Sequence, residues 1–207
     1  MAVQNTFIAT AHAFTGLVDA VPASRLAGPG LGDWTVRDLV GHAVSAGLAG
    51  VLTALGRPAS TEDIATPEAY YALAKTVDPA VVDAVVALST TDARQWGARL
   101  GERPADQVRQ LASQVVTAVS GTAPDALVTT AAGGMRLGRW LPTRTFELVV
   151  HGFDLAAAVD LPFEPPVDAL AESAALAARL AAVTGDGRAV VLALTGRHDL
   201  AAGFSVV

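Results

Sequence analysis

Two ionisable side chains on one predicted helix, Glu147 and His151, have the types and spacing that most clearly suggest chemistry. Residues four positions apart lie on the same face of a helix, one turn from each other. A carboxylate and an imidazole placed in this way can bind one divalent metal ion from the same side. The sequence therefore predicts that this pair supplies two ligands of a metal site, and that another element supplies the rest.

His42 is the best candidate for a third ligand, because it lies inside a second predicted helix that is otherwise mostly apolar. Two histidines and one glutamate form a three-ligand set that leaves the fourth position of a zinc ion open for water or substrate. Asp154 follows His151 by three residues, and Asp38 precedes His42 by four. We expect each acid to accept a hydrogen bond from its neighbouring imidazole and to orient it.

These residues also have interpretations that involve no metal. A glutamate and a histidine four residues apart are often only a hydrogen-bonded pair on a helix surface, and His42 alone would be interpreted as a buried core histidine. Arg144 lies three residues before Glu147. It could form a salt bridge with Glu147 or bind a substrate carboxylate, and we favour the salt bridge. The mostly apolar helix around the pair favours a metal site, because an unpaired carboxylate is costly to bury. For His12 and His198 we expect a structural and an exposed position, respectively.

The elements that must position these residues are mostly helices. Apolar periodicity, capping residues and prolines predict helices at about residues 2–21, 34–56, 66–77, 78–100, 104–120, 142–160 and 167–183. Two short β-hairpins are predicted, one around Gly133 and Gly134 and one formed by residues 189–194 with 203–207. The chain is therefore expected to be mainly α, with a metal-binding helical domain at 1–164 and a small C-terminal αβ appendage at 165–207.

Composition excludes some classes of function. The net charge is −6, and the sequence contains no basic tract, which argues against a nucleic-acid-binding protein.

Residues 39–56 are uncharged, but they include His42 and four glycines, so we expect a buried bundle helix and no membrane span. Only 16 % of the residues are charged, which fits a largely buried surface or an oligomer, and we expect a monomer or a homodimer.

The absence of cysteine limits the chemistry further. It excludes disulfides, structural zinc–thiolate sites and a cysteine nucleophile. Any thiol chemistry must therefore use a thiol from outside the chain. The first residues lack the basic region and the long apolar region of a signal peptide, so we expect a cytoplasmic protein.

The two histidine motifs resemble those of a known family. The motif residues are Trp34, Asp38 and His42 in the first, and Arg144, Glu147, His151, Asp154 and Leu155 in the second. This pattern is similar to the mycothiol-dependent maleylpyruvate isomerase family of the DinB-like superfamily. The resemblance covers most of the chain and is weakest over residues 60–125. It implies an antiparallel four-helix bundle that binds a divalent metal ion, usually zinc, at one end.

The resemblance also implies a set of ligands and a co-substrate. Carried over by position, the metal ligands are His42, Glu147 and His151, and the thiol mycothiol would bind at the metal as a thiolate. We therefore expect an enzyme that isomerises a small electrophilic substrate or transfers the thiol to it. Metal-dependent hydrolysis and non-catalytic metal or thiol binding remain as alternatives. Only about 40 residues follow Pro166, which is shorter than the C-terminal domain of the isomerase, so the reaction on maleylpyruvate itself is not implied.

Overall fold

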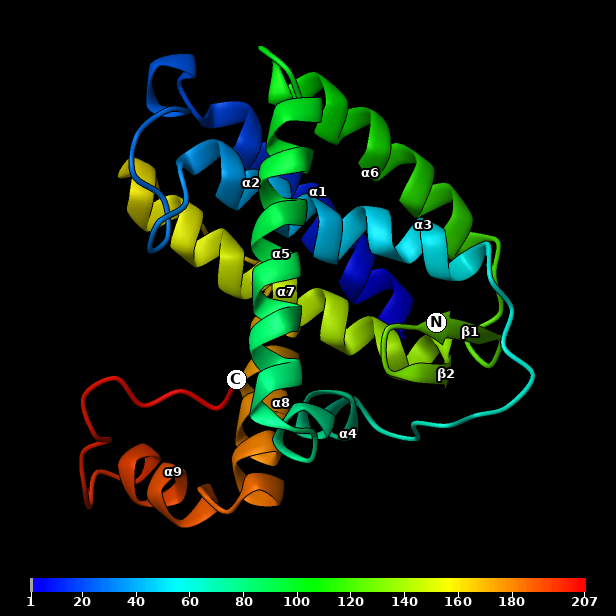
Figure 1. Ribbon diagram of the computed structural model, residues 1–207, viewed down its shortest axis with the longest axis vertical. Coiled ribbons are helices and arrows are strands. Elements are labelled where there is room, and N and C mark those ends of the chain that lie inside the picture. Colours follow the sequence, from blue (N-terminus) through cyan, green and yellow to red (C-terminus); the bar gives the residue numbers. More distant parts are fainter. Residues whose placement is uncertain (1) are drawn as a thin grey trace.

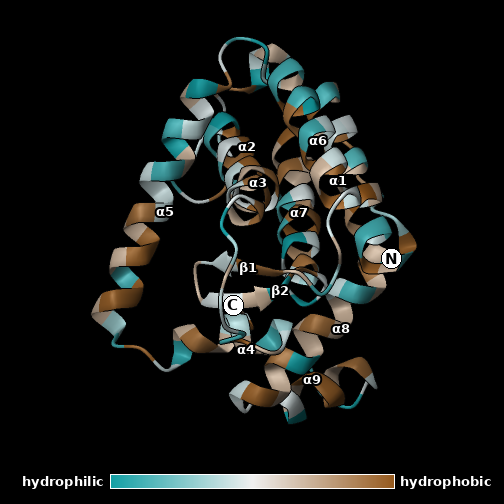
Figure 2. Ribbon diagram, turned by 90° about the vertical axis from the view of Figure 1, so that its right-hand side faces the viewer, coloured by the Kyte–Doolittle hydropathy of each residue, from teal (hydrophilic) through white to brown (hydrophobic). Residues whose placement is uncertain are grey.

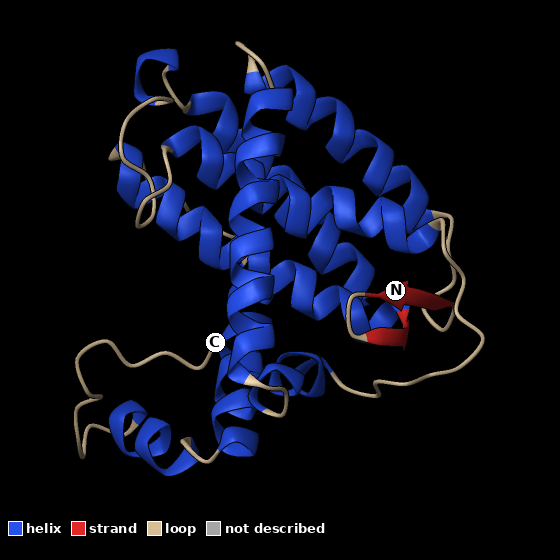
Figure 3. Cartoon of the chain, in the orientation of Figure 1, coloured by secondary structure: helices blue, strands red, loops and turns tan. Residues whose placement is uncertain are grey.

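The computed structural model describes residues 2–207, and within them the chain is mainly helical, with one small two-stranded sheet (Figure 1; Figure 3). The α-helices are α1 (Ala2–Ala20), α2 (Val36–Val44), α3 (Gly50–Leu55), α4 (Pro67–Ala72), α5 (Pro79–Arg99), α6 (Pro104–Ser120), α7 (Leu137–Val159), α8 (Val167–Thr184) and α9 (Gly187–Leu194). The strands are β1 (Leu127–Thr130) and β2 (Gly133–Arg136), and three short turns of other helix types are η1 (Ala23–Arg25), η2 (Ser45–Ala49) and η3 (Leu73–Lys75). The predicted mainly α fold is confirmed.

Local sequence signals explain where several helices begin. Thr35 and Asp38 form a reciprocal capping box at the start of α2, which satisfies backbone donors that a helix end leaves free. Thr66 accepts from the backbone of α4, and Asp78 accepts from the backbone of α5; a proline follows each of them at the first helical position. The predicted starts of these helices are therefore correct to within two residues.

The four-helix bundle consists of α1, α6, α7 and the continuous helix formed by α2, η2 and α3 (Figure 1). Each of these helices directs an apolar stripe inward. In α1 and α6, buried residues recur at intervals of four and three positions. The residues in these two stripes are Phe7, Ala11, Phe14 and Val18, and Val108, Ala112, Val115 and Val119. The same core includes the η2 residue Leu48 and three leucines of α7 at positions 141, 148 and 155.

The helix at 36–55 is the one segment of residues 2–207 that is long and apolar enough to cross a membrane by length and composition. Half of its most apolar window is buried inside the structure. Its middle, η2, is a π-helical turn, a type of irregularity that is common near functional sites. The apolar character of this helix therefore agrees with its place in the bundle core.

A close helix crossing fixes α5 against α2. A Cβ atom added to Gly41 would collide with the backbone carbonyl of Ala93 and the backbone nitrogen of Gly97. Only glycine allows the two backbones to approach so closely. Ser45, at the start of η2, also donates a hydrogen bond to Asp92 of α5. These contacts place the middle of α5 beside the residue that follows Gly41, which is His42.

The predicted first hairpin is present, but its details differ from the prediction. Strands β1 and β2 pair antiparallel with Thr130 opposite Gly133, so both predicted turn glycines belong to β2. The expectation that Pro142 starts the following helix is wrong, because α7 begins at Leu137 and contains the proline. The N–H of Leu137 donates to the carbonyl of Ala126, which satisfies a free donor of the first turn and lets the helix start directly after β2.

The C-terminal segment contains α8, as predicted, but the second β-hairpin is wrong. Residues 187–194 form α9, which packs on α8, and residues 203–207 are not in a strand. A short apolar run without alternation cannot be assigned to a strand or a helix by periodicity alone. An isolated two-stranded hairpin is also only marginally stable in water, whereas a helix can bury one face against its neighbour. Helix α8 itself packs against α4 and α7 and buries Leu176 and Leu180.

Candidate metal centre

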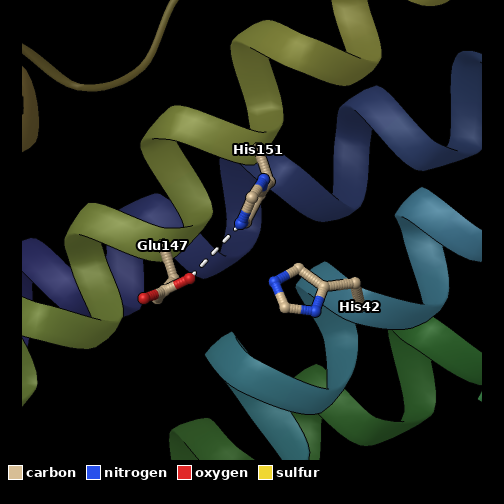
Figure 4. A group of neighbouring side chains, drawn as sticks. All are labelled: His42, Glu147 and His151. Atoms are coloured by element: carbon tan, nitrogen blue, oxygen red, sulfur yellow. Dashed lines mark ion pairs between the residues drawn. The ribbon is translucent and has the colours of Figure 1, made fainter. Parts of the chain in front are cut away.

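The bundle brings His42, Glu147 and His151 together, as Figure 4 shows. Helix α7 presents Glu147 and His151 on one face, and α2 presents His42 from the opposite side. One potential ligand atom from each side chain lies within 4.8 Å of the other two. All three residues are partly buried. Residues that are more than a hundred positions apart in the sequence therefore converge on one small volume.

The orientation of the three side chains suits a shared ligand. His151 Nε2 lies 3.3 Å from Glu147 Oε2. The rings of His42 and His151 are 4.6 Å apart between centroids and almost perpendicular. Ser89 Oγ lies 3.3 Å from His42 Nδ1, and the other ring nitrogen of His42 points toward the α7 pair (Figure 4). Two imidazole Nε2 atoms and one carboxylate oxygen therefore face a common point.

Each ligand candidate is held by a second contact on its far side. Asp154 Oδ2 lies 3.0 Å from His151 Nδ1, which is the contact predicted from the spacing of these residues. The hydroxyl of Tyr71, from α4, lies 2.8 Å from Glu147 Oε1. Partners of this kind fix the orientation of metal ligands in proteins. The site therefore has hydrogen-bonding partners behind its potential ligands.

The expected role of Asp38 differs from what the structure shows. Its carboxylate accepts hydrogen bonds from the backbone N–H and the hydroxyl of Thr35 at the start of α2. The residue that contacts His42 Nδ1 is Ser89 of α5, and the ring of Trp34 packs against the His42 ring at 4.8 Å between centroids. Asp38 prefers the capping position because it is the third residue of the helix, where the free backbone donors lie.

Arg144 is buried beside Glu147, and the predicted pairing is present. Its Nη2 atom lies 3.7 Å from Glu147 Oε1, and its Nη1 atom donates to the carbonyl of Ala46 in η2 at 3.0 Å. The guanidinium also lies over the rings of Tyr70 and Trp140, at 5.1 and 5.2 Å from their centroids. Stacking and hydrogen bonds of this kind compensate for burying a cation. Arg144 therefore holds a fixed positive charge next to the cluster.

The cluster has a defined pattern of protonation before any metal binds. Burial and the nearby charge of His151 lower the pKa of His42 to about 4. Burial acts against the charged forms of Glu147 and His151. The hydrogen bond from His151 and the charge of Arg144 nevertheless lower the pKa of Glu147 to about 2. Hydrogen bonds to Asp154 and Glu147 raise the pKa of His151 to about 9. At neutral pH His42 is therefore neutral, Glu147 is ionised and His151 carries the additional proton of an imidazolium.

These residues fit a divalent metal ion such as zinc. Two neutral imidazoles and one carboxylate are ordinary zinc ligands, and a set of three leaves one coordination position open. The ion pair between His151 Nε2 and Glu147 Oε2 lies in the direction in which both side chains would face an ion. His42, Glu147 and His151 would hold the ion, and Asp154, Ser89 and Tyr71 would keep their orientation. The other two histidines, His12 and His198, are exposed and lie outside the cluster.

Two residues that contact the ligand candidates were missed by sequence reasoning. Tyr71 and Ser89 both lie in the segment 60–125, in which no motif was recognised. The only usable signal is that Tyr70 and Tyr71 are the two tyrosines of the whole chain and stand side by side in a short helix. Ser89 carries no signal of its own, because its position depends on how α5 crosses α2.

Comparison with known proteins identifies the family. The family model described as the mycothiol maleylpyruvate isomerase N-terminal domain matches residues 8–156. No curated protein and no solved structure matches the chain significantly. The matched region contains most of α1 and α7, the other bundle helices and the three clustered side chains, and it ends before α8. The chain therefore belongs to the mycothiol maleylpyruvate isomerase N-terminal domain family.

Proposed function

We propose that this protein is a metal-dependent enzyme that uses an exogenous low-molecular-weight thiol, such as mycothiol, to isomerise or modify a small electrophilic substrate. The observation that carries the proposal is the convergence of His42, Glu147 and His151 within 4.8 Å in a chain of this family. A hydrolase would need the same three ligands. The thiol is favoured because the family name includes it and because the chain has no cysteine of its own.

The residues of the site have separate tasks in this proposal. A bound divalent ion would lower the pKa of a coordinated thiol, as zinc does for water, and would hold the thiolate toward the substrate. Tyr71 keeps one oxygen of Glu147 engaged, so that the other oxygen remains directed at His151. Asp154 and Ser89 fix the two imidazole rings through their Nδ1 atoms. The buried charge of Arg144 favours the ionised form of Glu147, which a metal site requires.

A polar groove beside the cluster offers room for the body of a polar thiol. It has a volume of about 420 Å³ and lies between η2, α3, α4, α5, α7 and the hairpin. Arg144, which contacts Glu147, forms part of its wall together with Arg57 and Asp92. Hydroxyl groups of serine and threonine side chains also line this groove. A thiol with several hydroxyl or amide groups would find hydrogen-bond partners along it. We place the protein in the cytoplasm, where small thiols are kept reduced.

The first test concerns the metal. The purified full-length chain should bind about one zinc ion, and His42→Ala and His151→Ala should each lose most of it. His12→Ala is the matched control, because His12 is an exposed histidine on α1. Elemental analysis after dialysis provides the measurement. Full metal content in both site variants would show that the ligands are wrongly assigned.

The second test concerns the open coordination position. In the cobalt-substituted protein, added mycothiol should produce a sulfur-to-metal charge-transfer band that grows to saturation. Because thiol binding displaces a proton, the apparent affinity should rise with pH until the bound thiol is fully ionised. Turnover of an ester or amide without thiol, in a protein that gives no such band, would refute the thiol proposal and favour a hydrolase. Saturable thiol binding without turnover of any electrophile would indicate a sensor.

A further inference from the structure

The N-terminal half of α5 carries apolar side chains that the bundle leaves uncovered. Val81, Val85 and Val86 are 51 %, 59 % and 59 % exposed, whereas Ala93 in the other half of the helix is fully buried against α2. Figure 2 shows this half of α5 as a largely hydrophobic segment that stands apart from the bundle helices. A contiguous apolar surface that lines a groove is a typical feature of a binding site.

These side chains form one wall of a groove of about 440 Å³. Helix α4, the following segment from η3 to Val77, and the turn between β1 and β2 provide the other walls. The lining residues are Tyr70, Tyr71, Leu73, Ala74, Val77, Val81, Val82, Val85, Val86, Ala131 and Ala132. None of them carries a charge, and the only polar side-chain groups are the two phenols. The volume is within the range of small-molecule sites, which are mostly apolar with a few polar groups.

The groove leads to the candidate metal centre along two of its walls. Tyr71 lines the groove, and its hydroxyl lies 2.8 Å from Glu147 Oε1. On α5, Ser89 lies four residues after Val85 and seven after Val82, on the same helix face. Ser89 Oγ is 3.3 Å from His42 Nδ1. A molecule in the groove would therefore have one end beside the cluster.

We propose that this groove binds the apolar body of the electrophilic substrate, an uncharged molecule with an aromatic ring or a short alkyl chain. The identification of the bound molecule as the substrate rests on the proposed function. A carboxylate in the groove would lose its hydration without meeting a cation, which is costly, whereas an apolar group would gain from leaving water. Tyr70 and Ala131 line both this groove and the more polar groove described above. The more polar groove remains free for the thiol.

An uncharged fluorescent probe, N-phenyl-1-naphthylamine, tests the groove in the full-length protein. Its fluorescence should rise on binding to the wild type. Val85→Glu and Val81→Glu should each weaken its apparent affinity by at least about tenfold, because a charge is placed against the probe. Both valines are more than half exposed, and glutamate favours a helix, so folding should persist. Leu88→Glu is the matched control, because Leu88 is 68 % exposed on the same helix and does not line the groove.

Competition then tests the class of ligand. Benzylideneacetone, an uncharged aromatic enone, should displace the probe, and maleate should not. Equal displacement by maleate, or equal losses of affinity in the groove variants and in Leu88→Glu, would overturn the proposal. It would also be overturned if sedimentation showed a wild-type dimer that Val85→Glu dissociates, because a second copy of the chain would then occupy the groove. Probe binding needs no metal. A failure of metal binding would therefore refute the proposed function without changing the result of the probe experiment.

Discussion

Zinc binding should release one proton from this protein, and its affinity should depend on pH accordingly. The pKa of His151 is about 9, that of His42 is about 4, and that of Glu147 is about 2. Between pH 5 and 8, His42 is therefore already neutral and Glu147 is already ionised. Only His151 must lose a proton before its Nε2 atom can bind a metal ion.

The magnitude follows from the pKa of His151. At pH 6 the imidazole lies three units below its pKa of about 9. Each unit corresponds to ~1.36 kcal/mol, so removal of the proton costs about 4 kcal/mol and weakens zinc binding by about a thousandfold. The affinity should therefore rise about tenfold for each unit of pH between 5.5 and 6.5. In this range a zinc-bound water is still protonated, since its pKa in proteins is about 7, so it does not add to the release.

Isothermal titration calorimetry measures the released proton directly. Zinc is titrated at pH 6 in buffers with different ionisation enthalpies, and the slope of the observed enthalpy against the buffer enthalpy gives the number of protons. We expect a value close to one. Asp154→Asn should lower this number near pH 8, because the loss of its charge lowers the pKa of His151. A value of zero at pH 6 would refute the protonated His151–Glu147 pair, and a value of two would mean that His42 is also protonated.

Three further substitutions test the surroundings of the site. Gly41→Ala should lower the free energy of unfolding by about 1–3 kcal/mol, because the helices α2 and α5 must separate. Gly16→Ala, which adds a Cβ in open space, should leave the midpoint of thermal denaturation unchanged or slightly raised. Equal stability of the two variants would contradict the close crossing of α2 and α5. Tyr71→Phe should weaken zinc affinity by about five- to tenfold through the loss of one hydrogen bond. Tyr70→Phe should have a smaller effect in the same chelator competition assay, because Tyr70 contacts Arg144 and none of the ligand candidates. Asp154→Asn should weaken zinc affinity by about 10–100-fold with unchanged circular dichroism, and wild-type affinity would show that the carboxylate does not orient His151.

The sequence alone predicts most of the helices and the first hairpin. Helix starts at Thr35, Thr66 and Asp78 follow from short-range hydrogen bonding between a side chain and the next few backbone N–H groups. The contact of His151 with Asp154 and the pairing of Arg144 with Glu147 were predictable for the same reason, since the spacing on one helix fixes which side chains can meet. Local geometry determines each of these features.

Other elements depend on interactions that no local pattern contains. Residues 187–194 form a helix that contacts α8 but buries none of its residues fully. Helix α7 starts before Pro142 because residues preceding β1 accept hydrogen bonds from its first backbone donors. The apolar composition of residues 189–194 predicts a strand, and the position of Pro142 predicts a later start of the helix. For α7 a tertiary contact outweighs the local preference, whereas for residues 187–194 the periodicity of a short apolar run does not distinguish a helix from a strand.

The candidate site shows the same division between sequence and tertiary structure. The motifs indicated His42, Glu147 and His151 as a set, but only the packing of α2 against α7 brings their ligand atoms within 4.8 Å. Tyr71 and Ser89 reach the cluster because α4 and α5 pack around it. The residues next to them in the sequence do not predict these contacts. Asp38, which the spacing placed beside His42, instead caps its own helix, since the backbone donors lie nearer to it. Residue type and spacing determined which groups could bind a metal ion, and the packing of distant helices decided which partners surround them.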